Sequence, residues 1–182
     1  ANGAASEAAP KLFRQLGIDA EFLACAPDGR NINRDCGSLH MGELSKSVAA
    51  GTADVGIAFD GDADRVLFVA ENGDLVEGDA VLLLAAEYLS QNNRLAQATV
   101  VTTVMANMGL AKSLRERGIS MVRTPVGDKY VLEEMQRRGA VLGGEQSGHI
   151  IFADAATTGD GLLTACRMLE IIAASGEPLS RL

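Results

Sequence analysis

Three aspartates stand at alternate positions in a short acidic loop, and they are the strongest candidates for chemistry in this chain. Asp60, Asp62 and Asp64 are separated by the small residues Gly61 and Ala63. Small residues permit a tight loop in which the three carboxylates can converge, and converging carboxylates repel one another unless a cation lies among them. Hard carboxylate oxygens suit Mg²⁺ or Ca²⁺. The spacing therefore predicts a metal site formed by the three aspartates.

Two simpler interpretations of this acidic loop stay open. An Asp-Gly pair beside a strand often marks a solvated turn and nothing more. Spaced aspartates also open the calcium loop of an EF-hand, which needs glycine at its sixth position and a helix on each side. Here the sixth position is Arg65, and the flanking runs 54–59 and 66–70 are short and apolar. The pattern favours a metal loop between two buried strands.

Arg65 places a fixed cation beside the predicted metal. Phosphoryl transfer needs this combination, because Mg²⁺ and a guanidinium together neutralise charge on the transferred phosphoryl oxygens. The planar fork of an arginine also matches phosphate oxygens. A local salt bridge between Arg65 and one of the aspartates is the alternative interpretation.

A second polar loop, residues 143–149, lies between the apolar runs 140–142 and 150–152. Its glycines allow close approach of the backbone to a ligand. Glu145, Ser147 and His149 bring a carboxylate, a hydroxyl and an imidazole, which suit a polyol such as a sugar. A glycine-rich turn with polar tips, and a merely structural histidine, are the alternatives.

A third segment follows the predicted strand 120–124 and opens a helix. Backbone N–H groups at a helix start favour an anion, which makes Gly127 a candidate contact, and Lys129 adds positive charge. A lysine on the solvated face of the helix is an equal alternative. In α/β sheets, ligands gather at the carboxyl ends of strands. We therefore expect the three segments to face one cleft at a domain junction.

Apolar periodicity predicts strands and helices that alternate along the chain, which indicates an α/β fold with mostly parallel sheets and a domain boundary near Gly78. Asn72-Gly73 predicts a hairpin turn. Asp79, Asn107, and either Thr158 or Asp160, are predicted helix caps. The predicted helices are 5–16, 41–50, 80–90, 108–117, 128–138 and 164–174. The predicted strands are 20–25, 54–59, 66–70, 75–77, 99–104, 120–124, 140–142 and 150–152.

Composition narrows the functional classes. The formal net charge of −8 argues against a nucleic-acid-binding surface. No apolar run is long enough to predict a membrane span. The three cysteines, Cys25, Cys36 and Cys166, are an odd number without C-x-x-C spacing. They indicate reduced thiols, and hence a cytoplasmic protein.

The two special loops together resemble the α-D-phosphohexomutase superfamily. Residues 60–65 match the metal-binding loop of that superfamily, and residues 144–149 match its sugar-binding loop, about 80 residues further on. Within the superfamily, the resemblance is greatest to the phosphoglucosamine mutase branch. Four further stretches carry it: 2–5, 31–38, 124–131 and 158–161.

The resemblance implies two tandem three-layer α/β/α domains with mostly parallel mixed sheets. They would be a metal-loop domain over residues 1–78, without its first strand, and a sugar-binding-loop domain over residues 79–182. They would correspond to domains 2 and 3 of a four-domain enzyme. The phosphoserine loop of domain 1 and the phosphate-binding loop of domain 4 have no counterpart in this sequence. The implied partners are therefore domains 1 and 4, and the piece alone is expected to be inactive.

The resemblance also implies a reaction, the interconversion of glucosamine 6-phosphate and glucosamine 1-phosphate through a bisphosphorylated sugar, for amino-sugar and cell-wall precursor synthesis. Mg²⁺, held by the three aspartates, would act beside the phosphoserine. Mutases for glucose or mannose phosphates, and a non-catalytic module that binds Mg²⁺ or sugar phosphate, are the alternatives. The implied catalytic residues are Arg65 and His149. The implied substrate-binding residues are Gly127, Lys129, Glu145, Ser147 and His149.

Overall fold

Three antiparallel strands form the first sheet of the computed structural model, which describes all residues from 1 to 182. The strands β1 (Val55–Phe59), β2 (Val66–Ala70) and β3 (Leu75–Val76) pair in the order β1-β2-β3. The turn from β2 to β3 contains Gly73 with a φ of +91°, a conformation that glycine adopts without strain. The predicted hairpin at Asn72-Gly73 is confirmed.

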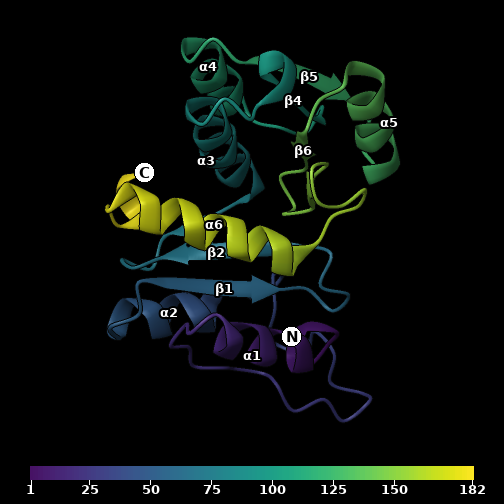
Figure 1. Ribbon diagram of the computed structural model, residues 1–182. Helices are drawn as coiled ribbons and strands as arrows, with labels where there is room; N and C mark the ends of the chain where they lie inside the picture. Colours follow the sequence, from purple (N-terminus) through teal and green to yellow (C-terminus); the bar gives the residue numbers. More distant parts are fainter.

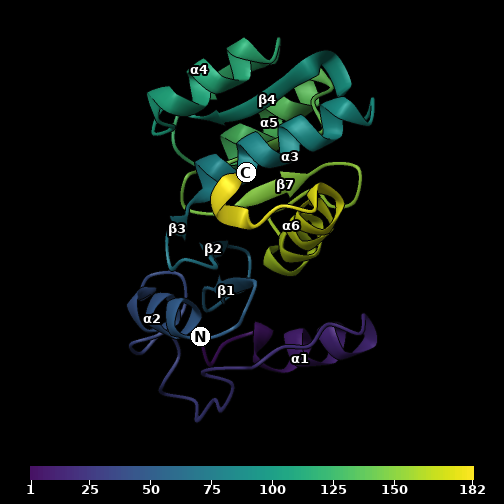
Figure 2. The same cartoon turned by 90° about the vertical axis from the view of Figure 1, so that its left-hand side faces the viewer.

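Helices cover both faces of this first sheet because every residue of its central strand β2 is apolar, so that both faces of the strand can be buried. Helix α2 (Gly42–Ala50) packs on one face, where Val48 and Val69 share a small core. Helices α1 (Ala5–Gln15) and α6 (Gly161–Ser175) contribute to the core on the opposite face, and Figure 2 shows α2 and α1 on either side of β1. The first unit therefore has three layers.

The second sheet has four strands in the order β5-β4-β6-β7. Strand β4 (Thr99–Thr103) pairs in parallel with both β5 (Ser120–Thr124) and β6 (Leu142–Gly144). Strand β7 (Ile150–Phe152) is antiparallel to β6. All five residues of β4 are buried, as expected for a central strand covered on both faces.

The second sheet is likewise the middle of three layers. Helix α5 (Asp128–Arg138) covers one face, and α3 (Gly78–Gln91) and α4 (Met108–Glu116) lie over the other. Two short 3₁₀ turns, Ala96–Ala98 and Leu179–Arg181, complete the regular structure. The predicted α/β class, with two three-layer units and mixed sheets, is confirmed, and its parallel pairs are confined to the second sheet. None of the helices combines the length and the apolar character of a membrane span.

Most predicted elements are present, and two predicted helix caps are confirmed. The Asn107 side chain accepts a hydrogen bond from the Leu110 N–H, at 2.8 Å, at the start of α4. The Asp160 side chain accepts one from the Leu163 N–H, at 3.0 Å, at the start of α6. Each cap satisfies an N–H group that has no partner within its helix.

Two predictions of local structure are wrong. Residues 20–25 do not form a strand, because no neighbouring strand pairs with this segment and Ala24 has a left-handed φ of 51°. Asp79 does not cap α3 and lies inside the helix, where its side chain accepts a hydrogen bond from the Asn107 N–H at 2.8 Å. A tertiary contact between the starts of α3 and α4 has replaced the local cap.

One apolar core of 26 buried residues joins the two units. It contains Phe68 from the first sheet, Leu142 from the second sheet and Met168 from α6. In Figure 1, α6 lies between β2 below and the second unit above, and it contacts β2, β7 and α3. The last helix is therefore a shared layer, and the two units are not independent in packing.

We predict that the two units unfold together, and that the α6 contact contributes strongly to their stability. Met168 is fully buried, so Met168→Ala should lower the free energy of unfolding by about 2–5 kcal/mol. Met108→Ala is the matched control, because Met108 is 75% exposed and its loss should cost about 0.5 kcal/mol or less. Urea denaturation, followed by circular dichroism, measures both. Two separate unfolding transitions, or equal effects of the two substitutions, would contradict this prediction.

Candidate functional site

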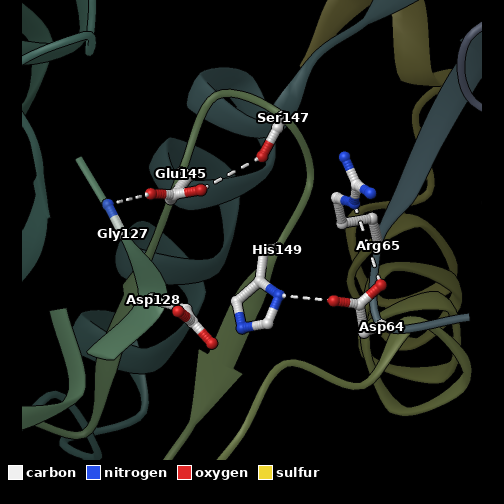
Figure 3. Close-up of a pocket in the computed structure, with 7 residues that line it drawn as sticks. All are labelled: Asp64, Arg65, Gly127, Asp128, Glu145, Ser147 and His149. Atoms are coloured by element: carbon white, nitrogen blue, oxygen red, sulfur yellow. Dashed lines mark hydrogen bonds and ion pairs between the residues drawn. The ribbon is translucent and has the colours of Figure 1, made fainter. Parts of the chain in front are cut away.

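A polar cleft of about 280 Å³ lies where three loops meet, and no apolar side chain lines it. One loop connects β1 to β2, the second connects β6 to β7, and the third leads from β5 into α5. Figure 3 shows the side chains of all three loops around the cleft. The lining residues are Asp64, Arg65, Gly127, Asp128, Glu145, Ser147 and His149.

Backbone contacts determine the shape of the acidic loop. The Asp60 N–H donates to the Arg65 carbonyl at 3.3 Å, which closes the loop at its base. Ala63 has a left-handed φ of 61°, so an alanine adopts here a conformation that glycine adopts more easily. A Cβ on Gly61 would lie 2.7 Å from the Asn33 amide nitrogen. Side chains of the 31–38 stretch therefore pack closely against the acidic loop at Gly61.

The three aspartates have different surroundings. Asp60 is buried, and its two oxygens accept from the backbone N–H and the Nε of Arg65, at 3.2 and 3.1 Å. Asp64 is half-buried, and its Oδ2 lies 3.1 Å from His149 Nδ1. Asp62 is exposed and makes no hydrogen bond through its side chain. No group of three metal-ligating side chains forms, so the predicted convergence of all three carboxylates does not appear.

Asp60 and Asp64 influence each other's ionisation. Burial raises the pKa of Asp60, and the neighbouring Asp64 carboxyl adds to that shift. Burial also acts to raise the pKa of Asp64, but the neighbouring Asp60 and His149 outweigh it, and the net shift is downward. The pKa values of two close carboxyl groups move apart in this way, because both cannot easily be charged at once.

The donor atoms of the acidic loop fit a hard divalent cation. Asp64 Oδ1 is buried and has no hydrogen-bond partner, and only the Arg65 Nε lies near it, at 3.7 Å. Asp62 presents a free carboxylate to solvent. An orphaned buried oxygen is costly, and a bound cation would remove that cost. Carboxylate oxygens are the ligands that Mg²⁺ prefers. Asp60, Asp62 and Asp64 could thus hold Mg²⁺ after Asp62 turns inward.

Arg65 forms the local salt bridge that the sequence offered as the alternative interpretation, and its contact with phosphate stays a prediction. Its Nε lies 3.1 Å from Asp60 Oδ2 and 3.7 Å from Asp64 Oδ1, so it forms the local salt bridge. Its two terminal nitrogens make no hydrogen bond with the protein. In Figure 3 the end of the guanidinium points away from Asp64. Arg65 is therefore anchored at Nε and still presents a free fork of N–H donors at the cleft.

The sugar-binding-loop candidates of the sequence come together on one side of the cleft. Glu145 Oε1 accepts from the Gly127 N–H at 3.0 Å, and Glu145 Oε2 accepts from the Ser147 hydroxyl at 3.4 Å. Gly127 is thus tied to the β6–β7 loop instead of standing free for an anion. Ser147 is exposed, so its hydroxyl can exchange this bond for one to a ligand.

His149 is 5% exposed, and both of its ring nitrogens have protein partners. Nε2 accepts from the Gly159 N–H at 3.0 Å, and Nδ1 faces Asp64 Oδ2 at 3.1 Å. Sequence reasoning did not find the Gly159 contact, because residue 159 is distant from the loop and carries no side chain. The catalytic role expected for His149 stays a prediction.

Two residues of the β5–α5 segment are placed differently from expectation. Lys129 does not line the cleft, and its ammonium lies 3.8 Å from Glu133 on the exposed side of α5. Asp128 does line the cleft, although the sequence analysis passed over it. Its position could have indicated a role, because Asp128 directly follows Gly127 and is the first residue of the helix. The sequence analysis assigned the charged group of this segment to the neighbouring Lys129 instead.

Close packing of Gly148 against β2 joins the second polar loop to the acidic-loop unit. The Val66 N–H donates to the Gly148 carbonyl at 3.1 Å. Gly148 has a φ of +92°, and a Cβ at this position would collide with the Val66 carbonyl. Only glycine satisfies both the conformation and the contact.

We predict that Gly148→Ala destabilises the protein far more than the same change at Gly118. Gly118 also has a left-handed φ, of +71°, but a Cβ there meets open space. Gly118→Ala should cost about 1–2 kcal/mol from backbone strain alone. Gly148→Ala should cost about 1–3 kcal/mol more, because the loop must also move away from β2. Chemical denaturation of the two variants is the measurement, and equal losses of stability would refute the close packing.

The fold and the cleft together define a class of protein, and comparison with known families identifies it. The phosphoglucomutase/phosphomannomutase α/β/α domain II model matches residues 1–73, and the α/β/α domain III model of the same family matches residues 77–182. The chain belongs to the phosphoglucomutase/phosphomannomutase family.

Curated relatives of this family are similar to the chain over its whole length. It is 55% identical over 181 residues to a phosphoglucosamine mutase of Solibacter usitatus, and 56% identical over 185 residues to that of Koribacter versatilis. Both comparisons cover 100% of this chain but only 41% and 40% of the relatives. The chain thus spans about two fifths of the length of the curated relatives it matches.

Solved structures show the same fold. A phosphoglucomutase/phosphomannomutase family protein of Burkholderia thailandensis has a TM-score of 0.87 at 34% identity, over 98% of this chain and 40% of that one. An N-acetylphosphoglucosamine mutase of Aspergillus fumigatus, in complex with GlcNAc-6P and magnesium, has a TM-score of 0.67 at 23% identity, over 94% of this chain and 42% of that one. The second likeness bears on the fold alone.

Proposed function

We propose that this chain is the metal-loop and sugar-loop part of a phosphoglucosamine mutase, which interconverts glucosamine 6-phosphate and glucosamine 1-phosphate. The observation that carries the proposal is the cleft itself. One free guanidinium fork, three carboxylates and a hydroxyl line it without any apolar side chain. The names of the relatives at 55% and 56% identity support the particular sugar.

The charge balance of the cleft supports a metal-assisted reaction on a phosphate. Arg65 is the only cation among the lining residues, and it stands against Asp64, Asp128 and Glu145. A phosphate dianion would be repelled from such a cleft unless another cation joined it. Mg²⁺ held by the acidic loop would supply that charge and polarise phosphoryl oxygens. Arg65 would then contact the phosphoryl oxygens through its free terminal nitrogens.

The opposite wall of the cleft supports recognition of a sugar. Glu145 and Ser147 already form a hydrogen bond to each other, and hydroxyl groups of a hexose could replace that bond on both sides. Such hydrogen bonds serve two orientations of one sugar, which a reaction through a bisphosphorylated intermediate requires. The phosphoserine and the remaining phosphate contacts would come from the parts of the relatives that this chain does not cover. We place the reaction in the cytoplasm.

A chimera tests the proposed function. Residues 1–182 replace the matching 41% of the Solibacter usitatus relative, and a coupled assay compares the 6-phosphates of glucosamine, glucose and mannose with Mg²⁺ present. We expect clear preference for glucosamine 6-phosphate. Asp62→Asn should lower kcat by about 10²-fold or more, because it removes transition-state charge stabilisation.

Two controls make this assay decisive. Turnover by the unaltered relative shows that the coupled assay works and that the serine is phosphorylated. Asp19→Asn is the matched substitution at an exposed aspartate away from the cleft and should leave kcat unchanged. Preference for glucose or mannose phosphate would agree with the family but contradict the proposed specificity for glucosamine phosphate. A folded, serine-phosphorylated chimera without turnover on any of the three would reject the proposal in favour of a binding module.

Metal binding gives a prediction for the 182-residue chain itself. At a concentration about 100 times its dissociation constant, Mg²⁺ should stabilise the chain by about 2.7 kcal/mol, seen as a higher Tm. The stabilisation should be lost in Asp64→Asn and kept in Asp19→Asn. Because the pKa of Asp60 is raised, protons compete with Mg²⁺ as the pH falls through that raised value, so the effect should shrink in acid. A Tm that does not respond to Mg²⁺ at neutral pH would contradict the predicted metal site.

A further inference from the structure

Asp128 lines the cleft, and the proposed function gives its carboxylate no partner. It is the first residue of α5 and is exposed. Figure 3 shows Asp128 and Glu145 on one side of the cleft, and Asp64 and Arg65 on the other. Gly127, which directly precedes Asp128, donates its N–H to Glu145 Oε1 at 3.0 Å. The Asp128 carboxylate is therefore held beside the wall that is assigned to the sugar.

Among the three carboxylates that line the cleft, Asp128 has the fewest partners. Asp64 has a histidine nitrogen at 3.1 Å and an arginine nitrogen at 3.7 Å. Glu145 accepts from a backbone N–H and from a serine hydroxyl. The Asp128 side chain has one hydrogen bond, in which its Oδ1 accepts from the Lys129 N–H at 2.8 Å, and the Lys129 ammonium lies near Glu133 instead. Oδ2 of Asp128 is left for a ligand.

The start of a helix explains only part of this carboxylate. A negative charge near a helix N-terminus interacts favourably with the helix dipole, and Oδ1 satisfies an N–H that has no partner within the helix. An asparagine would accept the same hydrogen bond without adding a negative charge to the cleft. The charge itself therefore calls for a second explanation.

An unpaired carboxylate in this cleft disfavours an anionic ligand. A phosphate monoester carries nearly two negative charges at neutral pH. Any Mg²⁺ in the acidic loop would lie on the other side of the cleft, next to Asp64 and away from Asp128. A sugar phosphate thus meets repulsion from Asp128 unless the sugar carries a cation of its own. The ammonium group at C2 of glucosamine is such a cation, whereas glucose and mannose have a neutral hydroxyl at C2.

The place of Asp128 also suits the order of groups around the sugar ring. The substituent at C2 is the direct neighbour of the hydroxyl at C3. A sugar whose ring hydroxyls meet Glu145 and Ser147 places its next substituent beside that wall, and Asp128 adjoins Gly127, which Glu145 holds. A carboxylate and an ammonium group at this point would form a charge-assisted hydrogen bond.

We propose that Asp128 is a specificity-determining residue that binds the C2 ammonium group of an amino-sugar phosphate and disfavours the phosphates of neutral sugars. This inference rests on the proposed function, because it concerns the same cleft and the same sugar. It adds the group that distinguishes glucosamine from glucose, which Glu145 and Ser147 cannot do through hydroxyls that the two sugars share.

Equilibrium binding tests this role without turnover. The chimera with the Solibacter usitatus relative, dephosphorylated so that no transfer occurs, is titrated calorimetrically with glucosamine 6-phosphate and with glucose 6-phosphate. Asp128→Asn keeps the size of the side chain and the oxygen that accepts from Lys129. It should raise the Kd of glucosamine 6-phosphate by about 10-fold or more, as expected for a lost charge-assisted hydrogen bond. The Kd of glucose 6-phosphate should stay unchanged or fall, and equal changes for the two sugars would overturn the proposal.

The pH dependence separates pairing with an ammonium group from a structural role. An amine with electron-withdrawing neighbours loses its proton near about pH 8. The ratio of the two Kd values should therefore shift against glucosamine 6-phosphate between about pH 7 and about pH 9 in the unaltered chimera. The ratio should change much less in Asp128→Asn. Comparing two sugars at each pH cancels titration of the protein, and equal pH dependence in both chimeras would contradict the pairing.

Kinetics of the phosphorylated chimera distinguish this inference from the proposed function. Asp128→Asn should lower kcat/KM for glucosamine 6-phosphate by about 10-fold, mainly through KM, and should not lower it for glucose 6-phosphate. Glu145→Gln should lower kcat/KM for both sugars, and Asp19→Asn, at an exposed aspartate away from the cleft, for neither. Absence of turnover in the unaltered chimera would reject the mutase function, while the Kd ratio would still decide the role of Asp128. A chimera that binds neither sugar would overturn both proposals.

Discussion

Backbone hydrogen bonds hold the acidic loop together, and the site depends on them. The Gly61 carbonyl accepts from Ala4, the Ala63 carbonyl accepts from Gly161, and the loop closes through Asp60 and Arg65. Carboxylates repel one another, so their own interactions cannot assemble such a loop. Here the main chain holds the carboxylates near one another. The Mg²⁺ that we propose would relieve the repulsion between them.

The same arrangement bears on how a single arginine could contact a phosphate in the cleft. The Nε of Arg65 is held by Asp60, so the side chain has lost much of its freedom before any ligand arrives. A preorganised fork loses less entropy on binding than a free one. In the function that we propose, the carboxylates around it would repel a phosphate that arrives without a metal. Binding of a phosphate would then depend on a metal, which couples the two components of a phosphoryl-transfer site in one step.

The sequence predicted the site residues that lie together in one loop, but it did not predict contacts between segments that are distant along the chain. Asp60, Asp64 and Arg65 were predictable because adjacent residues of the right chemistry share one tight loop. Glu145 and Ser147 were predictable for the same reason. Asp128, Gly159 and the contact of Asp79 with Asn107 were not, because each depends on which elements the fold brings together. The failed strand at 20–25 has the same cause: β-prone residues form a strand only beside a partner, and periodicity does not report partners.

The position of α6 has a consequence for how the chain folds. The inner face of the first sheet is covered partly by α1 and partly by α6, which lies about 100 residues further along the chain. At about 5–20 residues per second, synthesis leaves the part of this face beneath α6 uncovered for roughly 5–20 seconds. The first half of the chain cannot complete its core as it emerges, so the site forms late, after both polar loops and the last helix have been made. Nascent chains of this family should therefore depend on protection from aggregation until α6 leaves the ribosome.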